Sequence, residues 1–266
     1  MRSLDIGLTI VCLTLCLSVV AQAETDPSLV LYFDFEGGQG DIVEDRSDYG
    51  NDGTIEGGAK WGDGKFGKGL EIDGSSFILV PDCDEFRITD EITLACWAKF
   101  KAFASEVWEG NSYDFLVCRW NWAEGNNRCY ETYLASGAPG ISVSSDGTDA
   151  GASQAVAEES VQLDEWYNIV GVFDGSKVRM YVNGEEEGSE DYDGKILAGE
   201  GPISIGDNNA GLAPDFHFVG VIDEVAVYNR ALSQSEIKQR VMSNRILAVK
   251  SEDKLATTWG DIRIQY

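Results

Sequence analysis

The sequence predicts an all-β fold, a two-sheet antiparallel sandwich with one short C-terminal helix. Residues 166–173 and 177–182 are short β-branched and aromatic runs, joined by Asp-Gly-Ser and followed by Asn-Gly, which are typical of tight turns. The first run is apolar at nearly every position, whereas the second alternates between apolar and polar residues. A strand buried on both faces beside a strand buried on one face is what a two-sheet sandwich needs.

Residues 1–23 have the features of a signal peptide. Arg2 precedes an apolar run at 6–20, and Ala-Gln-Ala at 21–23 offers small residues for cleavage. The run is too short to favour spanning a bilayer. We therefore expect a secreted protein, extracellular or periplasmic, with no membrane span.

The rest of the chain has no Pro-rich or Ser-rich linker and no internal repeat. Because β-sandwiches commonly reach about 200–250 residues as one domain, we expect one domain at 24–232 and a C-terminal helix and tail at 233–266. The net charge of −26 repels phosphate backbones and anionic lipid, which argues against nucleic acid as a partner.

Other strands follow from shorter patterns along the chain. Residues 148–159 are small and polar, so they predict a long loop or a weak edge strand. Ser233 and Glu236 form a capping box, which predicts a helix of about three turns. Alternation at 262–266 fits either an added edge strand or a disordered tail. The remaining strands are predicted at 29–35, 77–80, 92–100, 114–120, 130–134, 141–145, 202–206 and 216–228.

Four cysteines follow the signal peptide: Cys83, Cys96, Cys118 and Cys129. An even count in an exported chain suggests two disulfides, and four cysteines allow three connectivities. The local pairs Cys118–Cys129 and Cys83–Cys96 are the preferred ones. A zinc site is the weaker alternative, because no CxxC pair occurs and the single histidine is distant in sequence.

Several motifs in order resemble the laminin G-like jellyroll family, within the concanavalin A-like lectin and glucanase fold. They are Gly-Asn-Asp-Gly-Thr at 50–54, Gly-Lys-Phe-Gly at 64–67, Asp-Gly at 73–74, Thr93 with Trp97, the hairpin at 166–188 and the closing motif at 222–233. The resemblance covers about 29–232 and implies a jellyroll in a secreted bacterial member. It also implies that the partner is a glycan or an extracellular protein.

The resemblance makes calcium a candidate cofactor. Asp223 resembles an aspartate that helps to bind a structural calcium in related glucanases, and its neighbours would lie near Asp34 and Gly74, with Asp73 available. Calcium prefers hard oxygen ligands. The alternative is that Asp223 only caps a strand or pairs with Arg230.

A hydrolase on this fold would need two carboxylates flanking the sugar bond. The related glucanases carry Glu-x-Asp-x-x-Glu, and the nearest match, at 71–76, ends in Ser76. With the second carboxylate absent, the prediction is that the protein is not an enzyme and has no catalytic residues. His217 alternates with two phenylalanines and is interpreted as a strand surface residue.

The segment 118–129 is the predicted ligand site. Trp120 and Trp122 could stack on a sugar ring, while Arg119 and Asn127 could bond its hydroxyls; either tryptophan could instead belong to the core. Trp108 is a second exposed candidate. The predicted function is therefore a secreted, non-catalytic module that binds carbohydrate. A protein-binding adhesion module is the alternative, and a polysaccharide-active enzyme is a weaker one.

Overall fold

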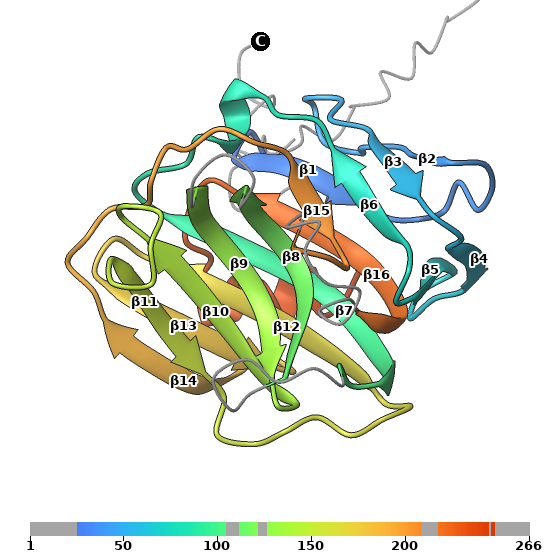
Figure 1. The fold of residues 1–266 in the computed structure, drawn as a ribbon. Helices are drawn as coiled ribbons and strands as arrows, with labels where there is room; N and C mark the ends of the chain where they lie inside the picture. Colours follow the sequence, from blue (N-terminus) through green and yellow to red (C-terminus); the bar gives the residue numbers. More distant parts are fainter. Residues whose placement is uncertain (1–25, 105–111, 122–126, 209–217, 245, 248–266) are drawn as a thin grey trace, which may run out of the picture.

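Two antiparallel sheets pack face to face in the structure, a computed structural model that describes residues 26–104, 112–121, 127–208, 218–244 and 246–247. Sheet A has the order β14-β13-β12-β7-β16-β5-β4, and β1 also pairs with β16. Sheet B has the order β11-β10-β9-β8-β15-β6-β3-β2 and lies in front in Figure 1. The predicted two-sheet sandwich is confirmed.

The strands of sheet A are β1 (Leu29–Phe33), β4 (Lys60–Asp63), β5 (Lys68–Asp73), β7 (Ile92–Ala102), β12 (Trp166–Phe173), β13 (Lys177–Val182), β14 (Glu185–Asp191) and β16 (Val219–Tyr228). The strands of sheet B are β2 (Ile42–Val43), β3 (Gly53–Glu56), β6 (Phe77–Val80), β8 (Tyr113–Asn121), β9 (Asn127–Ala135), β10 (Ala138–Ser144), β11 (Ala152–Val156) and β15 (Ile203–Ile205). A 3-10 turn, η1, covers Asp84–Phe86.

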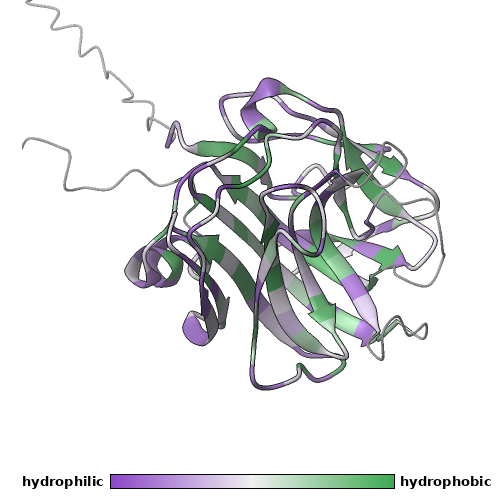
Figure 2. Ribbon diagram, turned by 60° about the vertical axis from the view of Figure 1, so that its left-hand side comes forward, coloured by the Kyte–Doolittle hydropathy of each residue, from purple (hydrophilic) through white to green (hydrophobic). Residues whose placement is uncertain are grey.

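The β12–β13 hairpin has the predicted bounds and the predicted burial. Ile169 and Phe173 of β12 face the core between the sheets, whereas Val170 and Val172 join a second apolar cluster on the outer face of sheet A. Asn183 and Gly184 both have positive φ, at 51° and 79°, as the turn between β13 and β14 requires. Figure 2 shows the apolar colouring concentrated on the strands of the two sheets.

A short helical segment covers the outer face of sheet A. It consists of α1 (Gln234–Glu236) and the π-helical turn η3 (Ile237–Val241), so it makes about two turns rather than the three predicted. The capping box at Ser233 is present. Ile237 and Val241 are fully buried against this face. No helix in the described ranges is both long and apolar enough to cross a bilayer.

Some strands carry little sequence signal. β14 is almost entirely acidic and polar, and it pairs only with β13, at the edge of sheet A. The weak edge strand considered for 148–159 is present as β11. The alternation at 262–266 lies outside the described residues.

Candidate functional site

Two β-bulges decide which side chains lie on the outer face of sheet B. The β8–β9 register shifts between Phe115 and Val117 and again between Arg119 and Trp120. The first shift places an extra residue on β8 and the second places one on β9. Beyond an extra residue, the side chains of that strand point to the opposite faces from those that regular alternation would give. As a result, Phe115 and Trp120, five residues apart on β8, share the outer face in one side-chain cluster.

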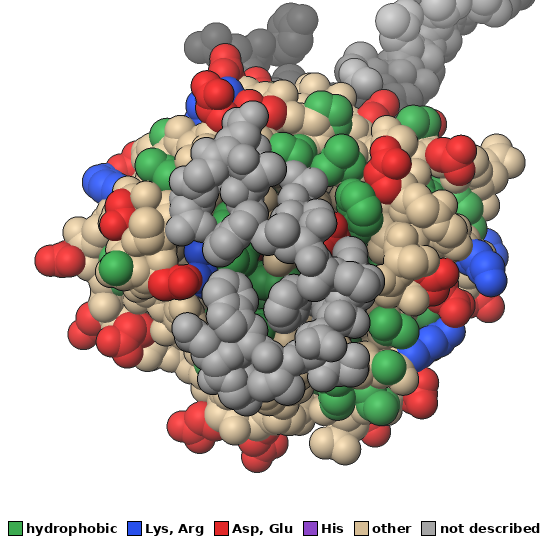
Figure 3. Space-filling model, in the orientation of Figure 1, with side chains coloured by type: hydrophobic (Ala, Val, Ile, Leu, Met, Phe, Trp, Pro, Cys, Tyr) green, Lys and Arg blue, Asp and Glu red, His purple; other side chains and the backbone are tan. Residues whose placement is uncertain are grey.

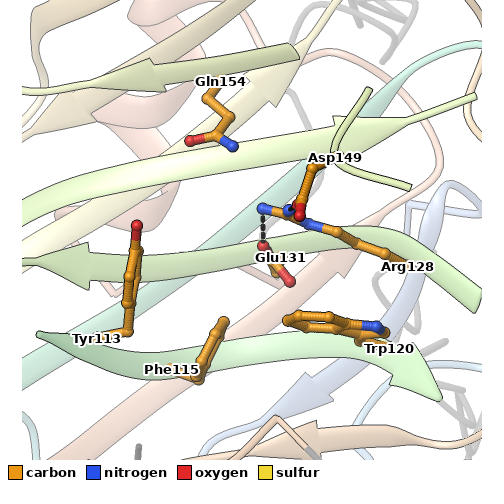
Figure 4. A pocket seen from close by; sticks show the side chains of 7 residues that line it. All are labelled: Tyr113, Phe115, Trp120, Arg128, Glu131, Asp149 and Gln154. Atoms are coloured by element: carbon orange, nitrogen blue, oxygen red, sulfur yellow. Dashed lines mark hydrogen bonds and ion pairs between the residues drawn. The ribbon is translucent and has the colours of Figure 1, made fainter. Parts of the chain in front are cut away.

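The outer face of sheet B contains a pocket of about 210 Å³. Figure 3 shows this face, hollowed, with hydrophobic, basic and acidic side chains inside the hollow. One wall is aromatic and comes from β8; the other is polar and comes from β9, the β10–β11 loop and β11 (Figure 4). The lining residues are Tyr113, Phe115, Trp120, Arg128, Glu131, Asp149 and Gln154.

The aromatic wall is a row of rings in contact. The ring centroids of Tyr113 and Phe115 are 6.3 Å apart in a stacked arrangement, and those of Phe115 and Trp120 are 6.1 Å apart, edge to face. The guanidinium of Arg128 lies 5.3 Å from the Trp120 ring centroid, a cation–π geometry. Trp120 is 4% exposed, so its ring supports Arg128 and closes one end of the pocket.

Arg128 connects two carboxylates in the polar wall. One terminal nitrogen lies 2.5 Å from Oε1 of Glu131 and the other bonds Oδ1 of Asp149. Glu131 is fully buried, and this burial raises the pKa of its carboxyl, with Arg128 opposing the shift. The Asp149 side chain is 71% exposed. Gln154 accepts a hydrogen bond from the Tyr133 hydroxyl at 2.8 Å.

Only one of the described residues predicted to bind a ligand lines the pocket. Trp120 lines the pocket, but Arg119 does not: it is 1% exposed, faces the core side of β8, and donates to the carbonyls of Phe86 and Gly201 and to Asp82. Asn127 begins β9 and is half-buried outside the pocket lining. Trp122, Trp108 and His217 lie outside the described residues.

The four cysteines are free thiols in the structure, so the predicted pairs Cys118–Cys129 and Cys83–Cys96 are not formed. Cys118 lies with the outer-face aromatic residues, where its thiol contacts Glu131 Oε2 at 3.7 Å. Cys129 is the extra residue of the second bulge, and its side chain belongs to the core between the sheets. Because the two side chains project to opposite faces of sheet B, they cannot approach for a bridge without a change in the backbone.

The residues predicted to bind calcium have other partners in the structure, and Asp73 lies apart from Asp223. Asp73 pairs with Val219 of β16, four residues from Asp223 and so about 13 Å along the strand. Asp73 caps the turn at Ser75 and Ser76, and Asp34 pairs with Arg46. In the described part of the chain, no three His, Cys, Asp or Glu side chains form a group that could hold a metal ion.

Asp223 has a different set of partners. Its carboxylate accepts the backbone N–H groups of Phe66 and Glu224, and burial raises its pKa to about 7. The suggested pairing with Arg230 does not occur, since Arg230 binds Asp26 and Glu236. The described residues therefore do not fit a three-carboxylate site, and calcium at Asp223 stays a prediction.

Solved structures with the same fold are binding domains or parts of larger proteins. Domain 4 of AbnA, an extracellular arabinanase from Geobacillus stearothermophilus solved with arabinotriose, has a TM-score of 0.62 and 19% identity, covering 79% of this chain and 97% of that one. The binding domain of Paraclostridial Mosquitocidal Protein 1 gives 0.61 and 16%, with coverages of 79% and 51%. The binding domain of Botulinum Neurotoxin DC, in complex with SialylT, gives 0.60 and 10%, with coverages of 82% and 52%.

These identities show a shared fold only, and the present chain spans about half of the two toxin domains. No curated protein matches the chain in sequence. Residues 73–238, more than half of the chain, match the family model Laminin_G_3, described as the Concanavalin A-like lectin/glucanases superfamily. The two-sheet antiparallel fold of the structure agrees with this sequence match. The chain belongs to this family.

Proposed function

We propose that this protein is a secreted, non-catalytic module that binds a sugar residue in the pocket on the outer face of sheet B. The observation that carries the proposal is the pairing of an aromatic wall with a polar wall across one small pocket. The arabinotriose bound by one structural neighbour supports a glycan as the ligand class.

The two walls match the two sides of a sugar ring. The rings of Tyr113 and Phe115 offer an apolar surface for the C–H groups of the ring, whereas Asp149 and Gln154 offer hydrogen-bonding groups for its hydroxyls. At about 210 Å³, the pocket is smaller than the roughly 300–1,000 Å³ typical of drug-sized ligands. A single sugar residue is therefore a better occupant than an extended chain.

Binding is favoured over hydrolysis by the position of Arg128. A glycosidase needs two carboxyl groups on opposite sides of the sugar bond, and Glu131 and Asp149 do both line the pocket. However, both bind Arg128, whose guanidinium lies between them (Figure 4). The second oxygen of Glu131 contacts the Cys118 thiol and the side chain is only 1% exposed, so this carboxylate is engaged within the protein.

A glycan array tests the proposal with two matched variants. Gln154→Ala removes a polar group of the pocket, and Gln162→Ala removes the same side chain from an exposed loop outside it. We expect glycan signals with the wild type and Gln162→Ala and weaker signals with Gln154→Ala. Equal signals from the two variants would argue against this pocket.

The same preparations are incubated with every glycan that binds, and the products are separated by chromatography. We expect no new reducing ends. Turnover that is lost in Glu131→Gln would show that the protein is an enzyme instead.

A further inference from the structure

We infer that the pocket selects uncharged sugar residues and excludes acidic ones, an inference that rests on the proposed sugar-binding function. The selection depends on how the lining residues share their charges. Arg128 is the one cationic side chain among the described residues that line the pocket, while Glu131 and Asp149 are both acidic. The lining therefore carries one more negative charge than positive charge.

The positive charge of Arg128 is paired with carboxylates of the protein itself. Both terminal nitrogens are engaged, one by Glu131 and one by Asp149. The side chains of Arg128 and Glu131 are only 8% and 1% exposed, so the ion pair between them is poorly screened by solvent. Within the described residues, only Nε of this guanidinium lacks a hydrogen-bond partner. A ligand carboxylate would have to displace a protein carboxylate to form a bidentate pair with Arg128.

The rest of the chain offers little to offset this charge. The other lining side chains, Tyr113, Phe115, Trp120 and Gln154, are uncharged. The internal segments 105–111, 122–126 and 209–217 contain no Lys or Arg in their sequences, and the whole chain carries a net charge of −26. An anionic sugar approaching the pocket therefore meets a field of its own sign.

A neutral polyol meets the same groups without that penalty. The exposed carboxylate of Asp149 can accept hydroxyl protons, and hydrogen bonds to a charged acceptor are among the stronger ones. The Tyr133 hydroxyl occupies Oε1 of Gln154, so the amide nitrogen of Gln154 is left as a donor. Hydroxyl groups satisfy both kinds of partner, whereas an added carboxylate is repelled by Asp149.

The test compares glycans that share one neutral core and differ by one acidic residue. An array carries neutral galactosides and arabinosides, each beside a counterpart with one added sialic or uronic acid residue. We expect neutral members to bind and the acidic counterparts to bind at least about tenfold more weakly, since like charges at an interface are costly. We also expect affinity for the neutral members to change little with salt concentration.

Asp149→Asn tests the cause of the selection. The variant removes one negative charge from an exposed side chain and weakens the contact of that side chain with Arg128. We expect the neutral-to-acidic preference to fall by about tenfold. Asp63→Asn is the matched control, because Asp63 is 95% exposed on β4 of sheet A and distant from the pocket; its preference should equal that of the wild type.

Each result has a definite reading. Acidic counterparts that bind as tightly as neutral glycans would overturn the inference and leave the proposed sugar-binding function intact. An unchanged preference in Asp149→Asn would overturn the assigned cause of the selection. Absence of binding to every glycan would overturn both the inference and the proposed function.

Discussion

The outer faces of the two sheets differ in what covers them. On sheet A, apolar side chains such as Val170 and Tyr228 are covered by the protein's own C-terminal segment through Ile237 and Val241. On sheet B, the corresponding face carries the pocket, whose lining combines charged and aromatic side chains (Figure 4). The protein's own C-terminal segment covers one face, whereas the other carries the pocket that we propose as a sugar site.

Two arginines on the paired strands β8 and β9 differ in the same way, one serving the core and the other lining the pocket. Arg119 points to the core, and all three of its guanidinium nitrogens bind described protein groups. Arg128 points to the pocket and retains an Nε without a partner among the described residues. Full hydrogen bonding is expected of a structural arginine, whereas Arg128 places its two terminal nitrogens on carboxylates of the pocket lining and leaves a buried Nε unpaired among the described residues.

The largest expected effect tests the covered face of sheet A. Ile237→Ala removes a fully buried side chain from the apolar cluster on that face and should lower the free energy of unfolding by about 3 kcal/mol. Urea denaturation measures the change. Glycan binding by the folded variant should be unchanged, because the pocket is on the other sheet.

Lys238→Ala is the control for this prediction. Its side chain is 43% exposed and pairs with Glu185, and such surface pairs contribute at most about 1 kcal/mol. If Ile237→Ala and Lys238→Ala lost equal stability, the C-terminal segment would not be packed on sheet A.

The second prediction concerns the buried side of the strand that forms the aromatic wall. Asp114 lies between Tyr113 and Phe115, is fully buried, and has one oxygen without a partner among the described residues. Burial raises its pKa from 3.8 to about 7. Its contribution to stability is therefore fully present below pH 3.8 and is lost as the pH rises through about 7, since the folded state binds the proton more tightly.

Asp114→Asn should remove this pH dependence. The amide oxygen can still accept the N–H of Ala104, and no charge is buried. We expect a gain of roughly 2 kcal/mol at pH 8, less than the full pKa shift implies because the site relaxes, and none at pH 3.5. Thermal unfolding between these pH values measures it; a parallel profile for wild type and variant would contradict the prediction.

The sequence was sufficient for the fold because its strongest patterns agree with the final packing. The β12–β13 hairpin, the strands β1 and β6 and the Ser233 capping box follow from local residues. β14 could not be predicted in this way, because Glu185–Asp191 has no apolar alternation and forms a strand only by pairing with β13. Its conformation depends on tertiary contacts, which local propensity does not contain.

The pocket was only partly predictable, and the bulges are the reason. Regular alternation along β8 would separate Phe115 from Trp120 and would give no sign that Arg128 joins Glu131 on β9. The two register shifts place all four on one face. A bulge reverses the facing of every later residue, and nothing in the local composition of these strands marks where it occurs.

The third prediction returns to the helical segment over sheet A. In the capping box, the Ser233 hydroxyl accepts the N–H of Glu236, and the Glu236 carboxylate accepts the N–H of Ser233. Ser233→Ala should cost about 1 kcal/mol of stability, measured by urea denaturation. Ser233→Thr retains the hydroxyl and should recover most of it; equal losses in both variants would show that the cap is not what holds the helix start.

The smallest expected effect is in the pocket itself. Tyr113→Phe removes one hydroxyl from the lining and retains the ring that stacks on Phe115. A neutral hydrogen bond contributes about 0.5–1.5 kcal/mol, so glycan affinity should fall by about threefold while the free energy of unfolding changes by less than about 0.5 kcal/mol. Calorimetric titration with a glycan that binds the wild type measures the affinity.

Tyr49→Phe makes the same chemical change outside the pocket, where the Tyr49 hydroxyl donates to the carbonyl of Pro27. This variant should bind glycans as the wild type does. If Tyr113→Phe lost stability without losing affinity, the outer face of sheet B would resemble that of sheet A, with its side chains serving the fold rather than a ligand.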